Sequence, residues 1–155
     1  MSKSFSLILL LFIALSSCKD ETDCCVLPES TIIRYGTSFG FCVGYCKRSI
    51  TLNSSSIEFI KSSWQDENNY PTVSCTNDFE AWEQLQSKID IDEFKEMDET
   101  IGCPDCADGG AEWIEILSGE DTHKVTFEHN KAPSEFEPFI DDLRDQLENQ
   151  EINCQ

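Results

Sequence analysis

The sequence predicts a single α+β domain: an antiparallel sheet of about four to five strands, with two main helices packed on one face and disulfides stabilising it. Three observations predict this fold class. Several short segments alternate between apolar and polar residues, as half-buried strands do. Two longer segments carry apolar residues at helical spacing behind N-capping side chains. Nine cysteines in 155 residues is a frequency typical of disulfide-bonded domains.

Five segments are predicted to be strands. The clearest alternation puts Arg48, Ile50 and Leu52 on one face and the polar residues between them on the other. A polar turn at 53–56 and the loop 118–121 each join two strands into a hairpin. Residues 65–76 and 99–110 read as polar, irregular segments. The five predicted strands are 31–35, 46–52, 57–64, 111–117 and 123–129.

The two main helices are predicted at 77–89 and 134–147. The first begins with a capping-box pattern at Asn77, and the second begins with the capping box Ser-Glu-Phe-Glu at Ser134. A further cap signal predicts a short helix between them, at 90–97. Since strands, helices, strands and a helix follow in that order, helices on one face of an antiparallel sheet are expected.

Residues 1–17 have the order of an export signal. A basic start at Lys3 is followed by an apolar run over 5–15 and then by two serines. The run is well short of the roughly 20 residues that a membrane-spanning helix needs. We therefore expect a cleaved leader (1–17), a tether (18–30), one domain (31–150) and a C-terminal tail (151–155).

The segment Leu15-Ser16-Ser17-Cys18 resembles the lipobox of bacterial lipoproteins. In that family the cysteine thiol is joined to diacylglycerol and the leader is cut just before it. The resemblance implies a mature chain that begins at a lipidated Cys18, anchored to a membrane by its acyl chains. The alternative is a plain secreted chain in which Cys18 forms a disulfide.

Lys19 followed by acidic residues is similar to the surface-export signal of Bacteroidetes-type lipoproteins. The similarity implies a cell-envelope protein at the outer membrane, with its domain facing outward. A short solvated tether is the alternative interpretation, since charged runs are commonly solvated.

The net charge of −19, or −20 once the leader with Lys3 is removed, excludes whole classes of partner. Repulsion disfavours nucleic acid and anionic membrane surfaces. The remaining partners are the membrane that holds the lipid anchor and a protein or another cell-envelope component.

Eight cysteines remain when Cys18 is set aside, and in an exported chain an even number indicates disulfides. Their connectivity is open among 105 possibilities. On one regular strand Cys42 and Cys46 would lie too far apart to pair, so they pair only if Gly40 and Gly44 mark a bend. The eight are Cys24, Cys25, Cys42, Cys46, Cys75, Cys103, Cys106 and Cys154.

Two chemical alternatives involve the same cysteines. Cys103 and Cys106 form a C-x-x-C, but the acidic residues around them and the glycines after them are a poor setting for a reactive thiol. With Cys42 and Cys46 they have spacings that a Cys₄ zinc site allows, although an oxidising compartment favours disulfides. We expect no metal and no cofactor.

Residues 39–45 resemble a motif of a family of uncharacterised bacterial lipoprotein domains, Cys-Phe-Gly-x-Cys-Pro-x-Tyr. Phe39, Gly40, Cys42 and Tyr45 match, whereas Ser38 replaces the first cysteine and Val43 replaces the proline. The resemblance implies a similar order of elements and no particular activity.

We expect a non-enzymatic binding or structural module of the cell envelope. The alternatives are an envelope thiol-disulfide oxidoreductase that uses Cys103 and Cys106, and a small inhibitor-like domain. No common hydrolase, metalloprotease or nucleotide-binding motif occurs. Trp64, Trp82 and Trp113 are interpreted as packing residues rather than as a ligand platform.

Overall fold

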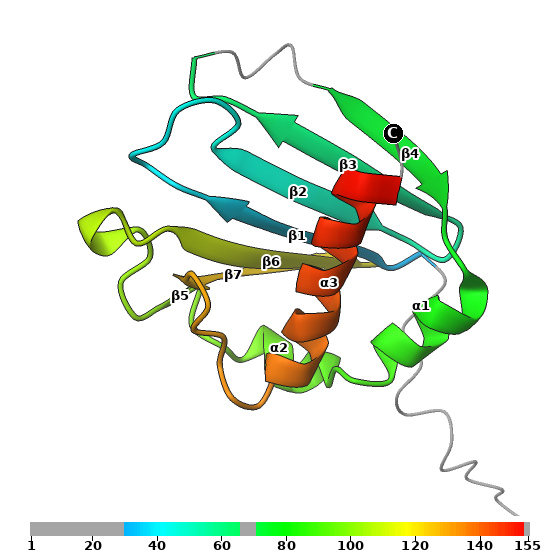
Figure 1. Cartoon of the computed structure of the whole chain (residues 1–155). Coiled ribbons are helices and arrows are strands. Elements are labelled where there is room, and N and C mark those ends of the chain that lie inside the picture. Colours follow the sequence, from blue (N-terminus) through cyan, green and yellow to red (C-terminus); the bar gives the residue numbers. More distant parts are fainter. Residues whose placement is uncertain (1–29, 66–70, 154–155) are drawn as a thin grey trace, which may run out of the picture.

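A seven-stranded mixed sheet forms the centre of the described chain. The computed structural model describes residues 30–65 and 71–153. The strands are ordered β4-β3-β2-β1-β6-β7-β5; β5 is parallel to β7, and the other neighbours are antiparallel (Figure 1). Their bounds are β1 (Ile32–Ser38), β2 (Lys47–Leu52), β3 (Ser56–Ser62), β4 (Thr72–Thr76), β5 (Thr100–Ile101), β6 (Ala111–Ser118) and β7 (Asp121–Glu128).

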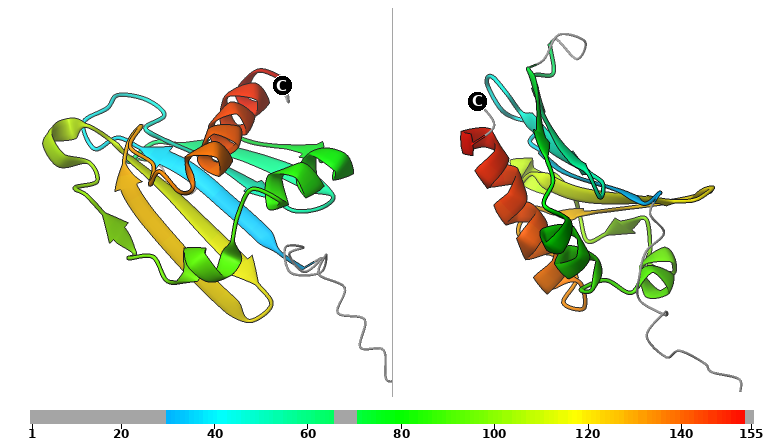
Figure 2. Two further views of the ribbon diagram at one scale, coloured as in Figure 1. Left: turned by 90° about the horizontal axis from the view of Figure 1, so that it is seen from below. Right: turned by 90° about the vertical axis from the view of Figure 1, so that its right-hand side faces the viewer.

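Three α-helices accompany the sheet: α1 (Phe79–Gln86), α2 (Ile91–Lys95) and α3 (Glu137–Asn153). Figure 2 shows them on the same side of the sheet, which leaves the other side uncovered. A single 3₁₀ turn, η1 (Cys106–Asp108), lies in the loop between β5 and β6.

The predicted fold class, an antiparallel sheet of four to five strands with two main helices, is wrong. The sheet is mixed, it has seven strands, and three helices are present in the described residues. The first missed strand, β4, lies in the segment expected to be irregular. It is an edge strand in which no residue is fully buried, so its sequence lacks a strong apolar alternation. Pro71 directly precedes it, a position that an edge strand tolerates.

The second missed strand, β5, has only two residues. Thr100 pairs with Thr126 and Ile101 pairs with Phe127, in the parallel direction. A run of two residues cannot show a period of any kind, and the surrounding glycines and cysteines indicate a loop. This pairing makes the sheet mixed.

The helix caps differ in part from the predicted ones. Asp78, not Asn77, caps α1 by accepting a hydrogen bond from the Ala81 amide at 3.0 Å. Asn77 instead donates its side-chain amide to the carbonyl of Asn53 at 2.7 Å. The predicted box at Ser134 is also wrong, because α3 begins three residues later, at Glu137. Proline at 138 suits the first turn of a helix, where its missing N–H costs nothing.

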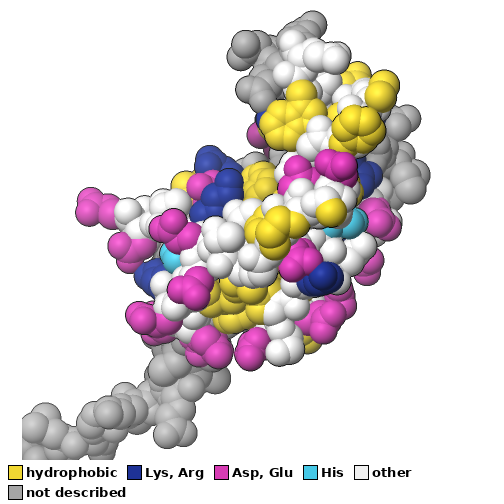
Figure 3. Space-filling view, turned by 90° about the vertical axis from the view of Figure 1, so that its left-hand side faces the viewer, with side chains coloured by type: hydrophobic (Ala, Val, Ile, Leu, Met, Phe, Trp, Pro, Cys, Tyr) yellow, Lys and Arg dark blue, Asp and Glu magenta, His cyan; other side chains and the backbone are white. Residues whose placement is uncertain are grey.

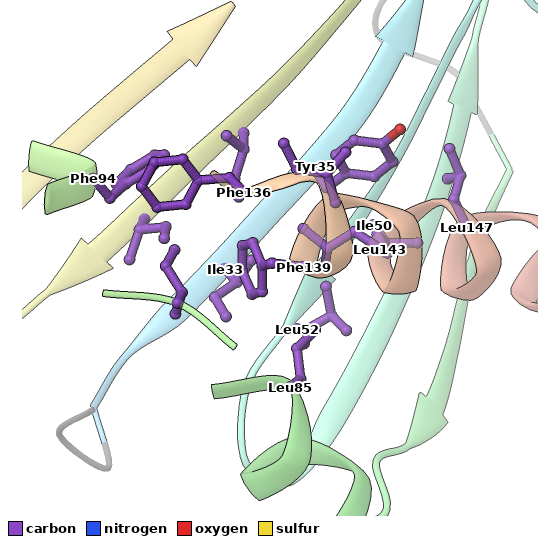
Figure 4. Close-up of a cluster of buried hydrophobic side chains, with 14 of the residues drawn as sticks. Ile33, Tyr35, Ile50, Leu52, Leu85, Phe94, Phe136, Phe139, Leu143 and Leu147 are labelled. Atoms are coloured by element: carbon purple, nitrogen blue, oxygen red, sulfur yellow. The ribbon is translucent and has the colours of Figure 1, made fainter. Parts of the chain in front are cut away.

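The core lies between the helices and the side of the sheet that they cover. Alternate residues of β1, β2, β3, β6 and β7 meet the stripe of α3, as in the pair of Ile33 and Phe139, both fully buried (Figure 4). Trp82 of α1 and Phe94 of α2 join the same cluster, with 3% and 2% of their surface exposed. Burial of this one face is the main stabilising contribution to the fold.

A buried charge fixes α3 to the sheet. Glu112 of β6 points to the helix side and is 0% exposed. Arg144 donates to its Oε2 atom from Nε at 3.1 Å and from Nη2 at 2.9 Å. The Asn130 amide donates to Oε1 at 2.9 Å, and His129 Nδ1 lies 2.8 Å from the same oxygen. Burial alone would lower the pKa of Arg144, but the hydrogen bonds and charge of Glu112 raise it.

None of the described helices is both long enough and apolar enough to cross a membrane.

Candidate binding groove

The uncovered side of the sheet carries a groove of about 520 Å³. Its floor follows a row of residues paired in register across neighbouring strands: Ile60, Ser49, Gly36, Trp113 and Thr126. Four of these five side-chain positions line the groove directly, all except the glycine. The volume is within the roughly 300–1,000 Å³ of small-molecule sites.

Trp113 occupies the middle of this row because its neighbour is a glycine. A Cβ atom at Gly36 would lie 2.6 Å from Cζ2 and 2.8 Å from Cε2 of the indole, closer than real Cβ contacts. The indole therefore covers the bare backbone of β1. Lys124 of β7 places its Nζ over the same ring, 4.4 Å from the centroid.

Trp64 forms a second aromatic wall, just beyond the end of β3. Its Nε1 donates to the carbonyl oxygen of Phe39 at 2.8 Å, which fixes the indole although 47% of the residue is exposed. Lys47 of β2 places its Nζ 3.7 Å from the centre of this ring. Each indole of the groove is thus held by the fold and accompanied by a lysine.

The groove is cationic in a strongly acidic chain. Lys47 and Lys124 line it from the uncovered face, and none of its lining residues in the described chain is acidic. The acid paired in register with Lys124 on the same face is Glu115, and its carboxylate is held by Arg34 at 2.9 Å. Hydroxyl groups supply most of the remaining polar lining: Ser38, Ser49, Ser62 and Thr126.

A disulfide loop joins two lining residues, Ser38 and Lys47, at one end of the groove. Cys42 and Cys46 are bonded, and Gly44 between them has φ of +93°, the bend that the pairing required. Phe41 and Val43 are 87% and 102% exposed. Figure 3 views this end of the molecule, where hydrophobic side chains gather above an acidic surface.

A second disulfide loop packs beside the first. Cys103 and Cys106 are bonded, and Asp105 between them accepts hydrogen bonds from the amides of Gly40 at 3.2 Å and Gly110 at 3.1 Å. The loop does not begin a regular helix. The turn η1 has only three residues, and Asp105 before it is in the left-handed conformation. In a thiol-disulfide oxidoreductase, the N-terminus of a helix or nearby cations activate the reactive thiol by lowering its pKa.

The structure describes some of the cysteines that were predicted to be lipidated or disulfide-bonded, and the others lie outside the described residues. The zinc alternative does not fit, because Cys42 with Cys46 and Cys103 with Cys106 form disulfides and zinc binds thiolates. Cys75, on β4, is also disulfide-bonded. The remaining candidates lie outside the described residues: Cys18, Cys24, Cys25 and Cys154.

No known protein family matches the sequence, and no curated protein matches it significantly. The case for a function therefore depends on the groove itself. Sequence reasoning interpreted its two tryptophans as packing residues. The available signal was the position of Trp113, on the polar side of a strand whose Ile114 and Ile116 face the core.

Proposed function

We propose that the chain is an exported lipoprotein anchored through Cys18, and that its domain is a non-enzymatic binding module of the cell envelope. The order of basic, apolar and small residues before Cys18 supports the anchor. The groove supports the binding role: two lysines and two fixed indoles line it on the uncovered side of the sheet, in a chain of net charge −19. This concentration of positive charge is the observation that carries the proposal.

The position of the groove suits a domain held by its N-terminus. The described chain enters β1 at Ile32, whereas Thr37 and Ser38 at the other end of the strand line the groove. These ends are about 20 Å apart, at roughly 3.3 Å per residue. The chain therefore enters the domain at the end of β1 opposite to Ser38.

The anchor is tested by cell fractionation of the wild type, Cys18→Ala and the matched variant Cys24→Ala. We expect the wild type and Cys24→Ala in the membrane fraction and Cys18→Ala released from it. Membrane retention of Cys18→Ala, with cleavage at the same site, contradicts lipidation.

The binding role is tested with a panel of anionic, neutral and cationic oligosaccharides and peptides. The double variant Trp113→Ala/Lys124→Gln changes the groove. Its matched control, Phe79→Ala/Lys88→Gln, removes an exposed aromatic ring and an exposed lysine from α1 and its C-terminal end. At least one ligand class should bind the wild type and the control but not the groove variant. If no ligand depends on the groove, the binding role is wrong.

A further inference from the structure

We propose that the groove binds an acidic saccharide, with a uronic acid ring on the indole of Trp113 and its carboxylate beside Lys124. This inference rests on the proposed binding function and names the ligand class for the same site. Three separate features of the lining match three features of such a ring.

The first feature is the aromatic and apolar floor. Trp113 and Ile60 lie in the same register row across the sheet, and Trp64 lines the groove beyond the end of β3. The C–H face of a sugar ring is apolar and flat enough to lie on an indole, which supplies a large contact area at low cost in side-chain entropy. Both indoles are already held in the free protein, so little ordering is needed on binding.

The second feature is the set of cations. Lys124 and Lys47 lie over the two indole rings at 4.4 Å and 3.7 Å. An exposed cation–π contact contributes only about 0.5–1 kcal/mol. A carboxylate forms charge-assisted hydrogen bonds that are stronger than neutral ones. Lys124 can therefore turn from the ring to the carboxylate when a sugar covers the face of Trp113.

The third feature is the hydroxyl lining. Four serine and threonine side chains border the groove on its own side of the sheet, among them Ser49 and Thr126 in the floor row. A hydroxyl both donates and accepts, which matches the hydroxyls of a sugar. An acidic peptide would pair with the cations, but it would not use the indole and hydroxyl groups of the floor. A saccharide accounts for all three features together.

The test uses intrinsic tryptophan fluorescence and calorimetry on the domain with its disulfides intact. The three probes are trigalacturonate, a neutral galactose trisaccharide and triglutamate. We expect trigalacturonate to bind at least about tenfold more tightly than either other probe, a difference of about 1.4 kcal/mol. Added salt should weaken its binding, because exposed charges are screened.

Two single variants assign the roles within the groove. Trp113→Ala and Lys124→Gln should each weaken trigalacturonate binding at least about fivefold, and Lys88→Gln should leave it unchanged. Circular dichroism establishes that each variant is folded, and Lys124→Gln keeps the test valid should Trp113→Ala be unstable.

Each other result overturns the inference. Equal binding of the neutral trisaccharide removes the need for an acid. Triglutamate binding that depends on Lys124 but not on Trp113 identifies an anion site without a sugar, and the proposed binding module then stands. Trigalacturonate binding that neither variant weakens places the sugar elsewhere. Absence of trigalacturonate binding also overturns it, and the wider panel then decides the binding role separately.

Discussion

The indole of Trp113 on β6 covers Gly36 on β1, at a distance that leaves no room for a Cβ atom. Such an atom would lie 2.6 Å from Cζ2 of the indole and 2.7 Å from the carbonyl oxygen of Arg48. The glycine thus sets where the aromatic floor of the groove lies. We expect Gly36→Ala to lower the free energy of unfolding by about 1–3 kcal/mol, the usual cost of overpacking. Urea denaturation measures it.

The same substitution in a Trp113→Ala background separates the two obstacles. Removing the indole leaves only the Arg48 oxygen close to the new methyl group, so part of the cost should disappear. If Gly36→Ala has the same cost with and without Trp113, the indole is not what excludes a larger residue at position 36.

Glu112 and Glu115 lie three residues apart on β6 and face opposite sides of the sheet, which makes them a matched pair. Glu112 is fully buried and pairs with a partly buried Arg144, whereas Glu115 pairs with a half-exposed Arg34. We expect Glu112→Gln to lower the free energy of unfolding by about 3 kcal/mol, because the partly buried guanidinium of Arg144 loses its charged partner. Glu115→Gln should cost less than about 1 kcal/mol. Equal costs in denaturant unfolding would contradict the anchoring role of Glu112.

The sequence was a good guide to elements whose pattern is local. The alternation of Arg48, Ile50 and Leu52 predicts a strand, and β2 contains all three. A bend marked by Gly40 and Gly44 was the condition for pairing Cys42 with Cys46; the bond is present, and Gly44 has the positive φ. Two strands were not predicted. The strand β4 has no buried residue, and β5 is too short to show a period.

The groove is not a local feature, and no single segment predicts it. Gly36 and Trp113 become neighbours only because β1 pairs with β6, an order that the hairpins alone do not specify. The cations come from β2 and β7, on opposite sides of that pair. The composition also gives no indication of these cations, because the net charge of the chain is −19.

Tyr35 should make the fold sensitive to alkali. Its side chain is buried beside Glu112, and burial, followed by the charge of that carboxylate, raises the pKa of the phenol well above 10. The unfolded chain loses this proton near pH 10 while the folded chain keeps it. Stability from this group is therefore complete below about pH 10 and falls above it by up to about 1.4 kcal/mol per pH unit.

The measurement is chemical denaturation at pH 9, 10 and 11 for the wild type and Tyr35→Phe. Phenylalanine keeps the ring and removes the titrating group, so the variant should lose less stability than the wild type across this interval. Parallel curves for the two proteins would show that Tyr35 ionises as readily in the folded chain as in the unfolded one.

Asp105 joins the two disulfide loops, and Asp108 offers a control with the same backbone. Both residues are in the left-handed conformation, with φ of 57° and 58°, so replacement by alanine carries a similar backbone cost at each. Asp105 alone of the two accepts from the amides of Gly40 and Gly110. We expect Asp105→Ala to lower the free energy of unfolding by about 1–2 kcal/mol more than Asp108→Ala. Amide exchange should also accelerate at Gly40 and Gly110 in Asp105→Ala only. Equal exchange in both variants would mean that the loops are held together by other contacts, such as the packing of Phe39 against Gly110.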